Sequence, residues 1–211
     1  MMLDGCVDYF ILFPSTGAED AQGAVGHYVP HEQGHVEVLR ARSPGTRDRE
    51  PEAFVLAFVG NAARAEQVAA WEAFQWKDKP VEVWAVNYPG YGKSTGPAKL
   101  KRFPGAALAA YDALRAQADG RRIFVKGESL GTTVALHVAA SRNVNGVILR
   151  SPVPLKHLIL GCFGWWNLWL GASTVAMGVP PQLDSLINAP QISVPGVFIL
   201  IEPDEIVPVS Y

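Results

Sequence analysis

The stretch Phe124-Val-Lys-Gly-Glu-Ser-Leu-Gly-Thr-Thr133 decides the fold, because an apolar run ends in a glycine-flanked serine and a helical pattern follows it. Its centre, Gly127-Glu128-Ser129-Leu130-Gly131, matches G-x-S-x-G, the pattern of a nucleophile elbow. In such a turn the serine adopts strained backbone, and the flanking glycines remove side chains that would collide across the turn. We therefore predict that Ser129 lies exposed above a helix N-terminus and that Gly127 and Gly131 shape the elbow.

Strand and helix patterns alternate along the chain after about residue 50. This alternation predicts an α/β fold, with a mostly parallel sheet flanked by helices. The predicted strands are 53–59, 81–87, 122–126, 146–152 and 194–201, and the predicted helices are 62–76, 104–118 and 132–140. Period-two alternation over 35–42 predicts a half-exposed antiparallel edge strand. The opening residues 1–14 lack a basic start and carry only a short apolar run, which favours a short strand over a signal peptide.

The composition limits the classes of function. With 211 residues, 49% of them hydrophobic and 18% charged, the chain is expected to form a single globular domain over residues 1–211. A net charge of −2 and no cluster of basic and aromatic residues argue against nucleic-acid binding. Cys6 and Cys162 lie far apart, which predicts neither a disulfide framework nor a zinc site and favours a cytoplasmic location. No dinucleotide or zinc motif appears, so we expect no cofactor and no metal.

A serine nucleophile needs a base that takes its proton and an acid that orients the base. Asp204 follows the last predicted strand, at the edge of the sheet where functional groups collect in open α/β sheets. The alternative is an ordinary aspartate in a turn. The presence of Ser129 favours a catalytic role for Asp204.

Two peptide N–H groups are expected to hold the oxyanion of the reaction. Leu130, directly after the serine, would supply one, and Asn61, in the loop after the strand over 53–59, would supply the other. The alternative for Gly60-Asn61 is a simple turn from strand to helix.

In these motifs and in their order, the chain resembles the α/β-hydrolase superfamily, in the branch with an H-G-N-A-G oxyanion loop. The resemblance covers about residues 50 to 208. It implies a serine hydrolase that cleaves esters, thioesters or amides through an acyl-enzyme, with Ser129 as nucleophile and Asp204 as acid. Val59 and Ala63 depart from the histidine and glycine of the family loop. The matching segments are Gly60-Asn61-Ala62, Asn87-Tyr88-Pro89-Gly90-Tyr91-Gly92-Lys93-Ser94, Gly127-Glu128-Ser129-Leu130-Gly131 and Asp204-Glu205-Ile206-Val207-Pro208.

The family places its catalytic histidine after a further helix and strand, whereas no histidine follows Asp204 here. We therefore expect the last strand and helix of the family fold to be missing, which would expose a sheet edge. His137 lies within a predicted helix, as a structural histidine would, and His157 follows the strand over 146–152. Two alternatives stay open: a non-catalytic or truncated member that acts as a binding module, and an acyltransferase or peptidase on the same scaffold.

Residues 158–183 contain no charged side chain, and Trp165, Trp166 and Trp169 cluster within them. A membrane span is not expected, because these residues lie between two strands of one sheet. The resemblance implies a lid or cap over about residues 154–190, whose tryptophans would line an acyl pocket or touch a lipid surface. The alternative is an ordinary buried helix. The expected substrate is a small acyl or lipid-like molecule, and the sequence does not specify the oligomeric state.

Overall fold

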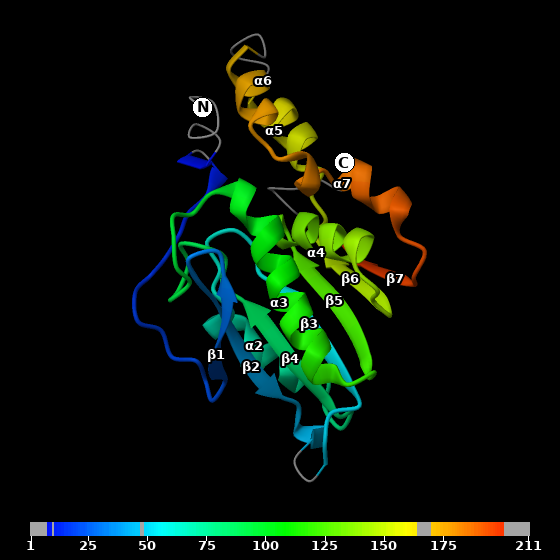
Figure 1. Cartoon of the computed structure of the whole chain (residues 1–211). Helices are drawn as coiled ribbons and strands as arrows, with labels where there is room; N and C mark the ends of the chain where they lie inside the picture. Colours follow the sequence, from blue (N-terminus) through cyan, green and yellow to red (C-terminus); the bar gives the residue numbers. More distant parts are fainter. Residues whose placement is uncertain (1–7, 10, 47–48, 164–169, 201–211) are drawn as a thin grey trace.

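The computed structural model describes residues 8–9, 11–46, 49–163 and 170–200. Within these ranges seven strands form one sheet, in the order β1-β2-β4-β3-β5-β6-β7 (Figure 1). Strands β4, β3, β5, β6 and β7 run parallel to one another. Strand β2 pairs antiparallel with β4, and β1 pairs antiparallel with β2. The predicted α/β fold with a mostly parallel sheet is confirmed. The strands are β1 Val25–His31, β2 Gly34–Arg42, β3 Ala53–Phe58, β4 Val81–Val86, β5 Arg122–Glu128, β6 Gly146–Arg150 and β7 Gly196–Ile199.

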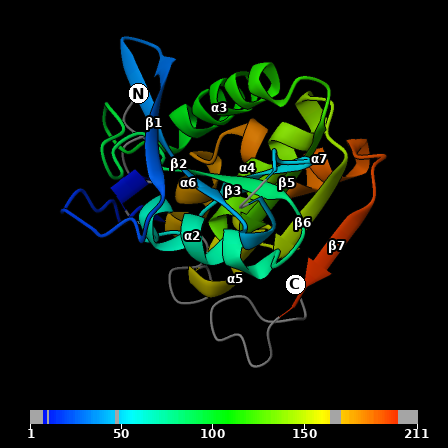
Figure 2. The same ribbon diagram turned by 90° about the horizontal axis from the view of Figure 1, so that it is seen from below.

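Helices cover both faces of the sheet. Figure 2 shows α2 on one side and α3 on the other. The side chains of β3 alternate between two cores, so that Phe54 and Leu56 face α3 and α4 while Val55 and Ala57 face α2. Both sets are buried, as expected for a central strand of a parallel sheet. The principal helices are α2 Ala65–Gln75, α3 Phe103–Ala118 and α4 Leu130–Ser141.

The prediction that residues 35–42 form the sheet edge is wrong. These residues belong to β2, which is antiparallel as predicted but lies between β1 and β4. The edge is β1, joined to β2 by a tight turn in which His31 pairs with Gly34. Its sequence contains glycine, histidine and proline instead of an apolar alternation, and Pro30 is tolerated because an edge strand has one unpaired side.

The prediction of a strand in the opening segment is also wrong. Residues 8, 9 and 11 are helical, and the N–H of Leu12 donates to the carbonyl oxygen of Asp8 at 2.9 Å. Leu12 is 5% exposed and joins the larger core. The apolar side chains of this helical turn therefore pack on the core of the domain.

A helical insertion stands between β6 and β7, where the cap was expected. In Figure 1, α5 and α6 lie beyond the end of α4 that follows β5. Among the described residues, no helix is long and apolar enough to cross a bilayer. Trp165, Trp166 and Trp169 lie outside the described residues, as do residues 201–211, so the predicted loss of a last strand and helix stays a prediction. The insertion contains α5 Leu155–Phe163, α6 Leu170–Met177, the short helix α7 Ser185–Asn188 and the 3-10 turns Pro181–Leu183 and Ala189–Gln191.

Candidate active site

Ser129 occupies the turn from β5 into α4. Its backbone has φ 48° and ψ −120°, a conformation that non-glycine residues rarely adopt. Two backbone hydrogen bonds fix the turn: Ser129 N–H donates to the carbonyl oxygen of Arg150 at 2.9 Å, and its own carbonyl accepts the N–H of Thr132 at 2.9 Å. The side chain is partly exposed at the N-terminal end of α4. A helix N-terminus carries a partial positive charge, which favours negative charge next to Ser129.

The glycines on either side of Ser129 allow close backbone contacts. A Cβ atom at Gly127 would lie 2.4 Å from the carbonyl oxygen of Gly131, and one at Gly131 would lie 2.2 Å from the carbonyl oxygen of Phe58. Neither distance is compatible with a side chain at the present backbone positions. Because neither glycine has a side chain, β5, α4 and the end of β3 can pack closely together.

The loop after β3 lies directly against Ser129. A Cβ atom at Gly60 would be 3.6 Å from Cβ of Ser129 and 3.5 Å from the carbonyl oxygen of Glu128. Across the described part of the chain, the peptide N–H groups of Asn61 and Leu130 have no acceptor. The segments that meet at the serine therefore each carry an N–H group without an acceptor among the described residues.

The side chain of Asn61 has a second role that the sequence interpretation missed. Its Oδ1 accepts hydrogen bonds from Phe13 N–H at 3.2 Å and from the hydroxyl of Tyr91 at 3.3 Å, and its Nδ2 donates to the carbonyl oxygen of Ile11. Asn61 thus connects the opening segment to the loop at Ser129. The only sequence signal for this contact was the family motif that contains Tyr91, and that motif does not show that Tyr91 bonds to Asn61.

Tyr88 and Tyr91, in the loop after β4, also bond to the loop after β3. The Tyr88 hydroxyl donates to the carbonyl oxygen of Val59 at 2.8 Å, and its ring stacks on Phe103 with centroids 4.2 Å apart. Burial raises the pKa of Tyr88 well above its usual range and raises the pKa of Tyr91 to about 12. Both phenols are therefore neutral donors at ordinary pH.

A buried polar network fixes the loop that carries these tyrosines. The Asn87 side chain donates to Glu37 at 2.9 Å and to Glu66 at 2.8 Å, and Glu37 also accepts the N–H of Lys93 at 2.8 Å. Arg64 forms an ion pair with Glu66. Burial alone would raise the pKa of Glu66, but hydrogen bonds from Arg64 and Asn87 outweigh it and lower that pKa. The network therefore fixes the position of the loop after β4.

Within the described residues, no histidine forms a hydrogen bond with the Ser129 side chain. His137 is buried within α4, where burial and, secondarily, the charge of Arg142 lower its pKa. His157 is exposed on α5. Asp204 lies outside the described residues, so its position relative to Ser129 stays a prediction. The described residues contain no cluster of three or more His, Cys, Asp or Glu that could hold a metal ion.

Comparisons with known proteins agree with this geometry. A family model described as alpha/beta hydrolase fold matches residues 77–176. An esterase of Pyrococcus furiosus, Pf2001, is similar in structure, with a TM-score of 0.67, 15% identity and coverage of 94% of this chain and 78% of the esterase. The chain has an α/β-hydrolase fold. No curated protein matches it at the level of sequence.

Other similar structures have the same α/β-hydrolase fold. An α/β serine hydrolase of Xanthomonas campestris described as lacking a lid has a TM-score of 0.58 and 16% identity, with coverage of 94% of this chain and 77% of that one. An acylaminoacyl peptidase of Pyrococcus horikoshii has a TM-score of 0.62 and 12% identity, with coverage of 89% of this chain. The chain spans only 33% of the length of that peptidase. At such identities the likeness establishes the fold alone.

Proposed function

We propose that the chain is a serine hydrolase that cleaves small esters, thioesters or amides through an acyl-enzyme on Ser129. The observation that carries the proposal is the backbone of Ser129, at φ 48° and ψ −120° in the turn between β5 and α4. Strained backbone of this kind persists where the surrounding structure enforces it, and it is concentrated at active sites.

In the proposed reaction the Ser129 oxygen attacks the substrate carbonyl carbon while a base takes the hydroxyl proton. The alcohol, thiol or amine then leaves with a proton, and water releases the acid from the acyl-enzyme. The negative charge that develops on the carbonyl oxygen needs donors that are already in place. The N–H groups of Asn61 and Leu130, which have no acceptor among the described residues, and the N-terminus of α4 support such a role.

The acid of the proposed machinery is Asp204, which follows the last described strand, β7, in the sequence. Its assignment rests on the resemblance and on its position in the sequence. The base is unassigned, because none of the chain's five histidines matches the position of the family base.

The second candidate function is a non-catalytic binding protein on the same scaffold. It is favoured by the lack of a histidine bonded to Ser129 among the described residues. An acyltransferase or peptidase would share Ser129 with the hydrolase and differ in the group that accepts the acyl chain or in the bond that is cleaved.

A fluorophosphonate probe tests the proposal, because it labels activated serines without requiring the natural substrate. We expect labelling of the full chain, and no labelling of Ser129→Ala. Ser141→Ala is a matched control, because Ser141 is exposed at the opposite end of α4 from Ser129. A folded wild-type chain that resists the probe would instead support the binding protein. Hydrolysis of p-nitrophenyl acetate, with and without an added alcohol acceptor, separates the hydrolase from the acyltransferase.

A further inference from the structure

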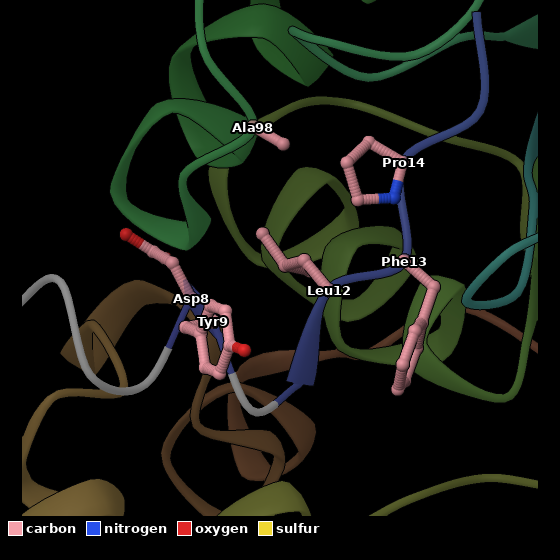
Figure 3. A pocket seen from close by; sticks show the side chains of 6 residues that line it. All are labelled: Asp8, Tyr9, Leu12, Phe13, Pro14 and Ala98. Atoms are coloured by element: carbon pink, nitrogen blue, oxygen red, sulfur yellow. The ribbon is translucent and has the colours of Figure 1, made fainter.

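The opening segment forms one wall of a surface cleft. The cleft has a volume of about 730 Å³ and is lined by Asp8, Tyr9, Leu12, Phe13, Pro14 and Ala98. Figure 3 shows the Leu12 side chain extending into the space between Tyr9 and Ala98. Binding sites for small organic molecules have volumes of about 300–1,000 Å³. The cleft is therefore large enough for a substrate group.

The cleft lies beside the candidate oxyanion loop. Phe13 donates its N–H to Asn61 Oδ1 at 3.2 Å, and Asn61 follows Gly60, which packs against Ser129. The Asn61 side chain also bonds to the carbonyl oxygen of Ile11, so one residue anchors both the wall of the cleft and the loop at the serine. The wall of the cleft and the loop at Ser129 therefore share one anchor, Asn61.

The chemistry of the lining selects an uncharged group. Leu12, Phe13, Pro14 and Ala98 are apolar, and Phe13 is 60% exposed. The carboxylate in the lining, Asp8, already accepts the N–H of Leu100 at 2.8 Å. The lining residues include no Lys or Arg, so a free fatty-acid carboxylate would find no cation to pair with among them, whereas an alkyl or aryl group would cover the exposed phenyl ring.

We propose that this cleft binds the neutral, apolar chain of the substrate whose carbonyl group reacts at Ser129. The proposal rests on the proposed function for its link to catalysis, but the binding itself does not need a reactive serine. The expected substrates are esters or thioesters that carry an uncharged medium-length alkyl or aryl group and no carboxylate at its far end.

Binding of 2-decanone, a neutral and unreactive carbonyl compound, tests the cleft by calorimetric titration of the Ser129→Ala protein. Ala98→Phe would fill the cleft, and Phe13→Asp would place a charge on an exposed position of its wall. We expect each added change to weaken binding about tenfold, the loss that corresponds to about two buried methylene groups. Ala109→Phe is the matched control, because Ala98 and Ala109 are both partly buried against the same core. Circular dichroism checks that each variant is folded.

The outcomes separate this proposal from that for Ser129. Equal affinities of all variants for 2-decanone, or no binding by Ser129→Ala up to the solubility limit of 2-decanone, would overturn the proposal that the cleft binds an apolar chain. Binding that Ala98→Phe weakens, in a chain that the fluorophosphonate does not label, would support the cleft and reject the catalytic role of Ser129. In an active chain, two esters show which part of the substrate carries the apolar group. If Ala98→Phe lowers kcat/KM for methyl decanoate, the acyl part lies in the cleft. If it lowers kcat/KM for decyl acetate, the alcohol part lies there.

Discussion

The hydroxyl of Tyr88 donates a 2.8 Å hydrogen bond to the carbonyl oxygen of Val59, the residue before the Gly60 that packs against Ser129. Tyr88 is 1% exposed, so water cannot readily replace this donor. The loop after β4 therefore determines the position of the loop after β3. In the proposed enzyme this contact would set the position of the Asn61 N–H.

Tyr88→Phe removes the donor and leaves the buried carbonyl of Val59 without it. We expect the free energy of unfolding to fall by about 1–3 kcal/mol, the cost of an unsatisfied buried polar group. The rate of fluorophosphonate labelling should fall as well, even under conditions where the variant is fully folded. Urea denaturation and time-resolved labelling measure the two effects. Tyr28→Phe is the control, since Tyr28 is 47% exposed; an equal effect of both changes would contradict the proposed positioning role.

Alkaline pH should destabilise the protein through Tyr91, whose pKa is raised from 10.0 to about 12 by burial. Because the folded pKa is the higher one, the stabilisation is fully present below pH 10 and is lost as pH rises from about 10 to about 12. Each pKa unit corresponds to about 1.4 kcal/mol, so the loss approaches about 3 kcal/mol. Urea unfolding at pH 9, 10 and 11 checks this. Tyr91→Phe should show a shallower decline, and an unchanged slope in that variant would refute the assignment.

Gly127→Ala should destabilise the fold strongly, because its Cβ would lie 2.4 Å from the carbonyl oxygen of Gly131. Both groups are backbone or attached to it, so a rotamer change offers no relief. We expect a loss of about 3 kcal/mol or more in urea denaturation. Gly17→Ala is the matched control, because nothing lies within 4 Å of its added Cβ, and this change should be nearly neutral.

The central strands and the elbow could be predicted from sequence because each depends on local chemistry. Strand β3 is a continuous apolar run, and Ser129 sits between glycines at the start of a helical pattern. Edge strand β1 escaped prediction because Val25–His31 has no apolar alternation and is stabilised by pairing with β2. The helical turn near Leu12 escaped for a similar reason, since its apolar side chains pack on a distant core.

The side-chain role of Asn61 could not be predicted, although the residue itself was chosen. Its partners Phe13, Ile11 and Tyr91 come from segments far apart in the sequence, and no pattern within any one segment specifies the contact. Tertiary hydrogen bonds of this kind follow from the topology of the sheet. Sequence reasoning therefore located the candidate site but not the wall beside it.

His137 should make the protein less stable in mild acid. Burial lowers its pKa below the usual 6.5, so the unfolded chain binds a proton more readily and stability falls as pH drops below about 6.5. His137→Leu should remove this decline between pH 7 and 5.5 in urea denaturation, and it should still react with the fluorophosphonate. Loss of labelling in the folded variant would instead indicate that His137 participates in the reaction.

Ser129→Gly should stabilise the protein at the expense of the nucleophile. A non-glycine residue at φ 48° and ψ −120° carries strain of about 1–3 kcal/mol, whereas glycine tolerates positive φ but loses more conformational entropy on folding. The net expectation is that Ser129→Gly is about 1 kcal/mol more stable than Ser129→Ala, which retains the strain while also lacking the hydroxyl. Thermal unfolding of the pair measures the difference without interference from the hydroxyl group. If the alanine variant proves equally stable, the turn is not strained, and the observation that carries the proposed function loses its force.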